Sequence, residues 1–467
     1  MDNISEKFRV GVLPGIANLY SRAWPELEIK LSEFIKETAG QLGSKEVEVF
    51  YCKPASTLEA IEAGCRELEA ANIDLLIVAL ALYCPSGAMA PALVKVRTPL
   101  LLWPVQGMYE LTAEGYDWDA VLLNHGVHAV QDLANLLGKS DKAFGVIHGH
   151  LQQADFREEM NGWIRAGRAI VAMGRSNPVQ IGGHFEDMLD LQVGEEKFVR
   201  KMGLKPEVVT QKEFAKIAAS ADRQSLDEYI RSYKETFDIG GDVDGELLEK
   251  TARGHFALDK ILKKHKSSAC GLNFLELCND EHIADGLHAA ASVFMAEGGG
   301  YAGEGDWVTA AFLYGAQQGL GMASFSEMFS VGYGDNRVAL KHWGEGNFKM
   351  SRNKPKMIKT ELADRYKAVF TAVDFEFKPG RACLININCD ADGQGRLITV
   401  SGTITDDHLP KVGGPRAVFK PDAADVREML TDYAYNGGSH HLVLAEGDCG
   451  QIFKKIARLS GWQYIEL

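Results

Sequence analysis

The 467-residue sequence lacks features that mark several classes of protein. Its eight cysteines form no C-x-x-C pair and suggest no disulfide framework, so reduced thiols in the cytoplasm are the simpler expectation. There is no run of about 18 apolar residues that could span a membrane, and Met1–Lys7 has no apolar signal-peptide core. A net charge of −14 and the absence of a basic stripe argue against nucleic-acid binding. We therefore expect a soluble cytoplasmic protein that does not bind nucleic acid.

What the sequence does contain, in its first third, is an alternation of apolar runs and amphipathic helical segments. Nearly continuous apolar runs are typical of parallel strands that are covered on both faces. Residues 1–168 are thus predicted to form a doubly wound α/β domain. The expected strands are 8–14, 46–52, 74–80, 99–103, 119–124 and 143–148, and the expected helices run from Ser56 to about Asn72 and from Val127 to Leu137.

Two histidines directly follow the expected strand 119–124. Ligands of such domains bind beyond the carboxyl ends of the strands, which makes His125 and His128 candidates for ligand contacts. A structural or helix-capping role is the alternative for each of them.

Two further domains are expected. Residues 169–322 form a second α/β domain that begins near Ala169–Gly174 and ends with a helix from Trp307; a helix over 281–297 carries His282 and His288, which we interpret as structural. Residues 323–467 have a different pattern, with short strands separated by Gly, Asp and Pro turns. This pattern predicts a mainly antiparallel, barrel-like domain. Its expected strands include 366–374, 382–388, 396–405 and 462–467, with a helix over 449–459.

The stretch Tyr-Ala-Gly-Glu-Gly-Asp-Trp at 301–307 places Glu304 between two glycines. Backbone of this kind bends sharply and lets a ligand approach closely, although an isolated G-E-G-D is also an ordinary surface turn. Downstream lie Glu327, His342 and the pair His440-His441. Two carboxylates and two or three imidazoles suit a divalent ion such as Mn²⁺. Their long spacing means that only the fold could bring them together.

With these residues the chain resembles the L-arabinose/L-fucose isomerase family, and most closely its L-arabinose isomerase branch. The resemblance rests on Met-Ala-Glu-Gly-Gly-Gly-Tyr-Ala-Gly-Glu-Gly-Asp-Trp-Val-Thr-Ala-Ala at 295–311, on Glu327 and His342, and on Gly-Gly-Ser-His-His at 437–441. It implies a cation site of Glu304, Glu327, His342 and His441, the second His of the pair being the family's ligand. The implied cofactor is Mn²⁺, with Mg²⁺ or Co²⁺ as alternatives.

The resemblance also implies sugar-binding residues and an assembly. The family's Gly-Ser-Gln-His-Leu-Tyr and Asn-Gln-Ser-Ala-His-Gly stretches appear here as 15–20 and 124–129, where Ala17 and His125 replace glutamines and His128 matches a sugar-contacting His. Family sites lie between subunits, so we expect a homo-oligomer, a hexamer or tetramer. The expected substrate-binding residues are Ala17, Trp103, His125, His128, Met188 and His440.

The implied reaction is a metal-dependent aldose–ketose isomerisation of a free sugar through a cis-enediol, with Glu304 and Glu327 in the acid and base roles. A metal-assisted hydride shift uses similar ligands. Two other classes stay open: a metal-dependent sugar hydrolase or lyase, and a non-catalytic sugar-binding protein. The absence of an export signal and the third domain that supplies His342 and His441 argue against the binding protein.

Overall fold

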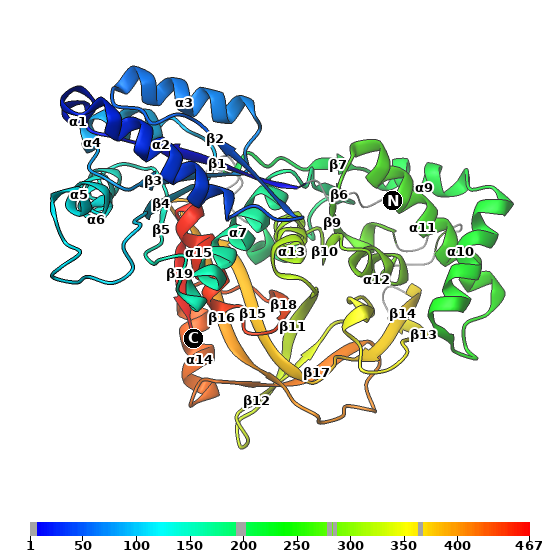
Figure 1. The fold of residues 1–467 in the computed structure, drawn as a ribbon. Helices are drawn as coiled ribbons and strands as arrows, with labels where there is room; N and C mark the ends of the chain where they lie inside the picture. The colour runs from blue at the N-terminus through cyan, green and yellow to red at the C-terminus, as the bar shows by residue number, and fades with distance from the viewer. Residues whose placement is uncertain (1–6, 193–201, 278–282, 284–286, 363–367) are drawn as a thin grey trace. The chain divides into compact units, whose positions relative to one another are not determined.

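The computed structural model describes residues 7–192, 202–277, 283, 287–362 and 368–467, so the predicted position of His282 lies outside the described residues. The chain divides into two compact units (Figure 1). Unit 1 comprises residues 1–168 and 454–462, and unit 2 comprises residues 169–453 and 463–467. Within the described ranges no helix has both the length and the apolar character that a membrane crossing requires.

Unit 1 is built on a five-stranded parallel sheet in the order β2-β1-β3-β4-β5. Every residue of β3 and β4 is buried, as expected for parallel strands covered on both faces. The strand order changes direction between β1 and β3, and the carboxyl ends of these two strands are where ligands of such sheets bind. The strands are β1 Phe8–Pro14, β2 Val47–Tyr51, β3 Leu75–Leu80, β4 Leu100–Pro104 and β5 Gly145–Val146, and the helices are α1 Asn18–Ala23, α2 Pro25–Gly40, α3 Leu58–Ala70, α4 Ser86–Leu93, α5 Trp118–Leu123 and α6 Gly126–Leu137.

One predicted strand is wrong, and the start of the second α/β segment also differs, because both stretches are helical. Residues 119–124 fall in α5, whose N-cap Asp117 accepts a hydrogen bond from the backbone N–H of Ala120 at 2.9 Å. No residue of α5 is buried, whereas a parallel strand would have to be covered on both faces. Residues 169–174, taken as the start of the second α/β segment, are the last turns of the 21-residue helix α7 (Ala154–Gly174).

Unit 2 begins with a four-stranded parallel sheet in the order β10-β9-β6-β7. Helix α13 packs closely on two of these strands through glycines. A Cβ on Gly300 would lie 1.9 Å from the carbonyl oxygen of Ala310, and one on Gly271 would lie 2.6 Å from the backbone N of Trp307. This close packing fixes the loop between β10 and α13, which carries Glu304. The elements are β6 Val179–Ile181, β7 Glu207–Val209, β9 Ala269–Leu272, β10 Gly300–Gly303, α9 Gln211–Ala219, α10 Arg223–Thr236, α11 Gly245–His265, α12 His288–Ala296 and α13 Trp307–Leu320.

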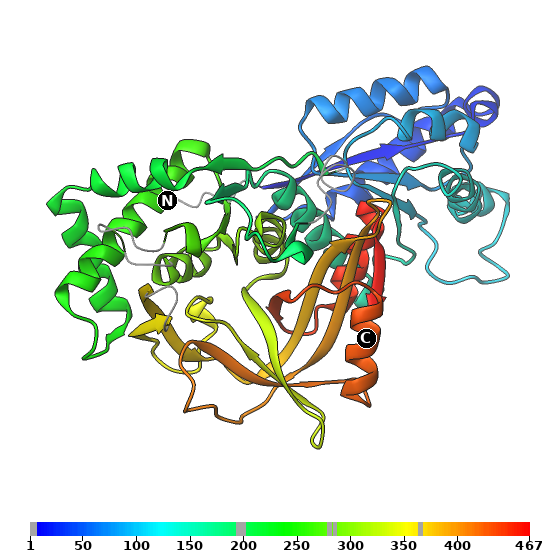
Figure 2. The same ribbon diagram turned by 180° about the vertical axis from the view of Figure 1, so that it is seen from behind.

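The remainder of unit 2 is a ten-stranded, mostly antiparallel sheet in the order β19-β16-β15-β18-β11-β12-β17-β14-β13-β8. An additional pairing between β16 and β17 closes six of these strands into a barrel, seen from both sides in Figures 1 and 2. Leu340, Leu384, Ile398, Phe419 and Leu442 belong to its buried core. The predicted fold class is therefore confirmed. The strands are β8 Asp238–Ile239, β11 Ala323–Gly332, β12 Arg337–Lys341, β13 Lys356–Leu362, β14 Ala368–Glu376, β15 Gly380–Cys389, β16 Gly395–Ile404, β17 Pro415–Pro421, β18 His441–Glu446 and β19 Gln463–Glu466, with helix α14 Val426–Tyr435. Helix α15 (Gly450–Ser460) begins in unit 2, and its residues from Lys454 onward belong to unit 1.

Candidate metal centre

Glu304 follows directly after β10, at the carboxyl end of the central sheet. Its backbone is left-handed, with φ of +53°, and that of Gly305 has φ of +78°. A non-glycine residue in this region carries a strain of about 1–2 kcal/mol, so the surrounding contacts must hold it there. The Glu304 carbonyl accepts a hydrogen bond from the Phe185 backbone N–H at 3.2 Å, and the Gly305 carbonyl accepts one from the Gln180 side chain at 2.9 Å. The bend holds the Glu304 side chain in a buried position.

The barrel brings three more side chains to Glu304. Glu327 on β11 lies directly opposite His441, the first residue of β18, and His342 follows the end of β12. His441 Nε2 lies 3.0 Å from Glu304 Oε2 and 3.4 Å from Glu327 Oε1, while His342 Nε2 lies 3.4 Å from Glu327 Oε1. The structure thus gathers all four residues that the resemblance assigned to a cation.

Each imidazole of this cluster has a carboxylate on its far side. His441 Nδ1 lies 2.9 Å from Asp306 Oδ2, and His342 Nδ1 lies 3.0 Å from Glu345 Oε2. Glu345 is itself buried and accepts a hydrogen bond from the Tyr301 hydroxyl at 3.1 Å. A carboxylate hydrogen-bonded to the ring, as Asp306 is to His441, orients a metal-ligating histidine and fixes its tautomer. Glu345 lies beside His342 as an ion-pair partner.

The electrostatics of the cluster are those of a site that holds positive charge. Burial alone would lower the pKa of His441, but its contacts with Asp306 and Glu304 outweigh this and raise the pKa to about 10. Burial likewise opposes the charge on His342, yet Glu345 and Glu327 raise its pKa well above the ordinary value. For Glu327, burial is outweighed by His342 and His441, and the pKa is lowered. Buried carboxylates in this arrangement require compensating positive charge. Protonated histidines or a metal ion can supply it.

The donor set fits a divalent metal ion. Ligand atoms of Glu304, Glu327 and His342 all lie within 4.8 Å of one another, and so do those of Glu327, His440 and His441. Mixed carboxylate and imidazole sets suit first-row divalent ions. His440 and His441 therefore both remain geometrically able to take part, although only His441 is fully buried and also contacts Glu304.

His440 differs from His441 in its partner and its exposure. Its Nδ1 lies 2.6 Å from Asp190 Oδ2, and its Nε2 lies 3.9 Å from Glu327 Oε1. Its side chain is 38% exposed, so it borders the cluster on the side that solvent reaches. Met188 is half-buried in the same segment as Asp190.

In unit 1, His125 and His128 lie against the loop after β3. The backbone N–H of His125 donates to the Ala81 carbonyl at 3.2 Å, which places both histidines at a carboxyl end of the sheet even though the segment before them is helical. The two nitrogens of the His125 ring are both occupied, by the Val121 carbonyl at 2.7 Å and by the Tyr83 backbone N–H at 3.2 Å. In this arrangement neither ring nitrogen of His125 is free for a sugar. Its expected sugar-contacting role stays a prediction.

The other three candidates of unit 1 differ in accessibility. His128 is exposed and stacks on Tyr83, with ring centroids 4.6 Å apart. Ala17 is buried, and its backbone N–H donates to the Tyr83 carbonyl at 2.8 Å. Trp103 is 1% exposed and stacks on Phe156, so it packs in the interior of the chain, and its expected sugar-binding role stays a prediction.

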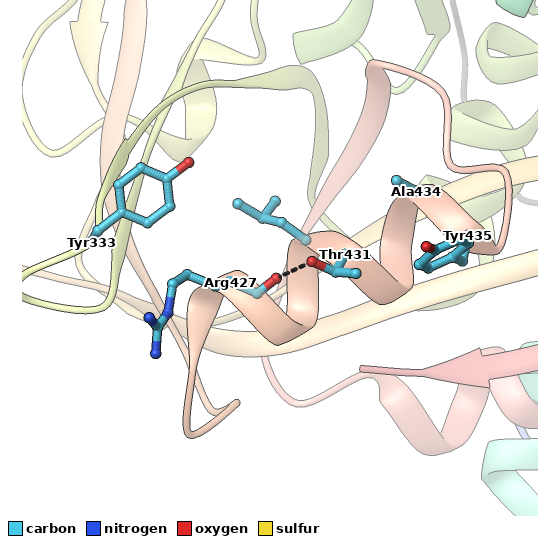
Figure 3. Close-up of a pocket in the computed structure, with 6 residues that line it drawn as sticks. Tyr333, Arg427, Thr431, Ala434 and Tyr435 are labelled. Carbon is cyan, nitrogen blue, oxygen red and sulfur yellow. Dashed lines mark hydrogen bonds between the residues drawn. The ribbon is translucent and has the colours of Figure 1, made fainter.

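A surface hollow of about 810 Å³ beside α14 is not a continuation of this cluster (Figure 3). Its charged group, Arg427, already pairs with Asp425, and the Thr431 hydroxyl donates to the Arg427 carbonyl at 2.6 Å. None of its lining residues is a candidate ligand. The lining residues are Tyr333, Arg427, Leu430, Thr431, Ala434 and Tyr435.

Sequence reasoning missed the carboxylates behind the histidines. Asp306 is expected only as part of a turn, and neither Glu345 nor Asp190 is among the residues expected at the site. Two of them had a local signal: Asp306 lies two residues after Glu304, and Glu345 three residues after His342. Asp190 and His440 are 250 residues apart, and only the fold brings them together.

We expect Asp306→Asn to weaken Mn²⁺ binding by about 10–100-fold, the usual cost of losing such a partner of a ligating histidine. The asparagine oxygen still accepts the Thr309 backbone N–H that Asp306 Oδ1 accepts at 2.9 Å, so the cap of α13 is retained and the loss is specific to His441. The Mn²⁺ dissociation constant, measured by titration calorimetry, checks this. Unchanged affinity would mean that Asp306 serves only as the helix cap.

Comparison with known proteins agrees with this geometry. The model of the L-arabinose isomerase central domain matches residues 188–320, and that of the L-arabinose isomerase C-terminal domain matches residues 322–463. The chain is 23% identical to the L-arabinose isomerase of Herpetosiphon aurantiacus and 24% identical to that of Aeromonas hydrophila subsp. hydrophila, in each case over 99% of this chain and 94% of that protein.

Among solved structures, a periplasmic solute-binding protein of an ABC transporter from Actinobacillus succinogenes 130z with bound D-allose aligns with 67% of this chain and 91% of that chain, at 14% identity and a TM-score of 0.16. A score that low carries no argument about this chain. The two domain matches together span more than half of the sequence and include Glu304, Glu327, His342 and His441. The chain belongs to the L-arabinose isomerase family.

Proposed function

We propose that this chain, as an aldose–ketose isomerase of that family, uses a divalent cation held by Glu304, Glu327, His342 and His441 to isomerise a free sugar. The observation that supports this most is the convergence of two glutamates and two buried histidines, each histidine backed by its own carboxylate. Such a set is suited to a cation. We propose Mn²⁺ as that cation, with Mg²⁺ and Co²⁺ as alternatives.

The two glutamates are proposed as the acid and base of the reaction. Isomerisation moves one proton between adjacent carbons and another between their oxygens, which requires groups within hydrogen-bond reach of both. The bound cation would supply charge stabilisation for the oxygens of the reacting carbons. In the cis-enediol route, Glu304 and Glu327 carry the protons. A hydride shift is the alternative, and incorporation of solvent deuterium at the reacting carbon distinguishes the two, because only the enediol route exchanges that proton.

A panel of free aldoses and ketoses assayed with added Mn²⁺ tests the substrate. We expect L-arabinose to be a secondary substrate. Ala17 has no hydrogen-bonding side chain and both His125 ring nitrogens are engaged, so a sugar hydroxyl placed near them would lack partners, which a buried site disfavours. Another aldose, six-carbon or modified, should have the higher kcat/KM. If L-arabinose gives the highest kcat/KM of a broad panel, this interpretation of the amino-terminal substitutions is wrong.

We also propose a homo-oligomer, a hexamer or tetramer, in which His128 acts at the metal cluster of a neighbouring subunit. This rests on the resemblance and on the exposure of His128 in unit 1. Mixing inactive His128→Ala with inactive Glu304→Gln should then restore part of the activity, because some mixed sites contain both intact residues. No recovery, with subunit exchange demonstrated by mass spectrometry, would place each complete site within one chain.

A further inference from the structure

A lysine stands beside the metal cluster on the same face of the barrel. Glu327 on β11 pairs directly with His441 on one neighbouring strand and with Lys341 on the other. Residues that face each other across antiparallel strands point to the same side of the sheet, with Cβ atoms about 4.5–5.5 Å apart. Lys341 is therefore the immediate neighbour of Glu327 on the surface that carries the cluster.

The Lys341 ammonium forms no ion pair within the described part of the chain, although the carboxylates of Glu345, Glu327 and Asp374 attract it from a longer distance. Lys341 pairs across the strands with Arg416, but Arg416 is bound by Asp374 and by backbone carbonyls. The Lys341 ammonium donates to the His342 carbonyl at 3.1 Å, and among the described residues no carboxylate lies within 4.0 Å of it. The carboxylates of Glu327 and Glu345 contact histidines instead. A half-buried ammonium with one backbone acceptor and no ion-pair partner among the described residues has hydrogen-bond donors left for a ligand.

Two exposed aromatic rings border this ammonium. Its Nζ lies 5.5 Å from the ring centroid of Phe329 and 5.2 Å from that of Trp343, and the two rings contact each other edge to face. Both side chains are more than 40% exposed, at 42% and 44%. Trp343 also follows His342 directly. The lysine thus stands between the metal cluster and an aromatic surface that is open to solvent.

We propose that Lys341, bordered by Phe329 and Trp343, binds the anionic oxygens of the substrate, so that the preferred sugar carries a carboxylate or a phosphate away from its carbonyl end. This inference rests on the proposed function, in which the carbonyl end lies at Glu304 and Glu327. A neutral sugar leaves the ammonium without its partner, and a site built to bind a charged group discriminates strongly against a ligand that lacks it. The carboxylates of the cluster would repel an anionic sugar. The Lys341 ammonium is therefore the group that would favour an anionic sugar over a neutral one.

Equilibrium binding tests the proposed anion subsite, formed by Lys341 with Phe329 and Trp343, independently of turnover. The Mn²⁺-loaded protein is titrated with a polyol and with the terminal phosphate of the same polyol, neither of which can isomerise. We expect the phosphate to bind at least 10-fold more tightly, roughly the discrimination that one charge-assisted contact gives. Lys341→Met should remove this preference and Lys341→Arg should retain it. Lys420→Met, an exposed lysine on β17 of the same barrel, is the matched control and should bind as the wild type does.

Turnover then identifies the anion. Matched sets of a hexose, its uronic acid and its 6-phosphate are compared by kcat/KM, which separates a carboxylate from a phosphate. Lys341→Met should raise KM for the anionic substrate about 10-fold or more and leave neutral sugars nearly unchanged. Circular dichroism confirms that each variant is folded, and Lys341→Gln replaces Lys341→Met if the latter aggregates.

Two outcomes would separate this inference from the proposed function. If neutral sugars are isomerised best and Lys341→Met slows neutral and anionic sugars alike, the isomerase stands and the anion subsite is refuted. If the polyol phosphate binds through Lys341 while no sugar is isomerised in the presence of Mn²⁺, the subsite stands and the proposed function is refuted. A preference for the phosphate that survives in Lys341→Met also refutes the subsite, since the anion would then bind elsewhere.

Discussion

Replacement of Glu304 or of Glu327 by glutamine is expected to lower kcat about 10²–10⁴-fold, the usual contribution of a general acid or base. Glutamine occupies nearly the same space but cannot exchange a proton with the sugar. It is also a neutral and weaker ligand for a cation, so loss of metal would add to the effect. Steady-state kinetics at saturating Mn²⁺ and saturating sugar measures the change in kcat alone.

The control for these variants is Glu428→Gln, which removes an exposed carboxylate in the first turn of α14. It should retain wild-type kinetics. The thermal midpoint of each active-site variant should stay close to that of the wild type, because no volume is lost from the buried position. A glutamine variant that keeps more than about a tenth of the activity would exclude that glutamate from the acid–base pair, since such a group contributes at least about 10²-fold.

Removal of divalent metal is the second change with a large expected effect. Charge stabilisation by a metal ion is worth several kcal/mol in the transition state, so dialysis against a chelator should lower activity about 10²-fold or more. Mn²⁺ should restore it. Elemental analysis of the dialysed protein, followed by titration with Mn²⁺, Mg²⁺ and Co²⁺, measures both the requirement and the preference.

This experiment has an optical readout besides activity. Co²⁺ bound by imidazole and carboxylate groups absorbs in the visible, so its binding can be followed in wild type and in His441→Ala. We expect the wild type to bind and the variant to bind weakly, because His441 contacts both Glu304 and Glu327. Full activity after chelation with no metal detected would contradict the proposed mechanism, whatever the spectrum shows.

Much of the architecture followed from local sequence pattern. The nearly continuous apolar runs at 8–14 and 74–80 predicted buried parallel strands, and they form β1 and β3. The alternating, turn-punctuated segments after residue 366 became β14, β15 and β16 of the barrel. The run 119–124 failed because periodicity does not distinguish a short apolar helix from a short strand; the N-cap Asp117 and the lack of burial decided for the helix.

The candidate site also has a part that local sequence pattern predicted and a part that it did not. The glycines around Glu304 were a local signal of a bent backbone, and the left-handed φ of +53° at Glu304 agrees with it. The assignment of Glu327, His342 and His441 came from a family resemblance, since their spacing in the sequence carries no geometry. The burial of the Trp103 indole and the bonding of both His125 ring nitrogens could not be predicted, because a sequence reveals neither.

By itself, then, the sequence determined the class of the fold and the residues able to supply carboxylates and imidazoles, because local propensity and residue chemistry are properties of short segments. Only the tertiary structure decided which of these groups meet. The register of three antiparallel strands places His441, Glu327 and Lys341 side by side, and the glycine-mediated packing of α13 on β9 and β10 holds Glu304 and Asp306 against them. Contacts between residues more than a hundred positions apart depend on strand register and packing, which no local pattern specifies.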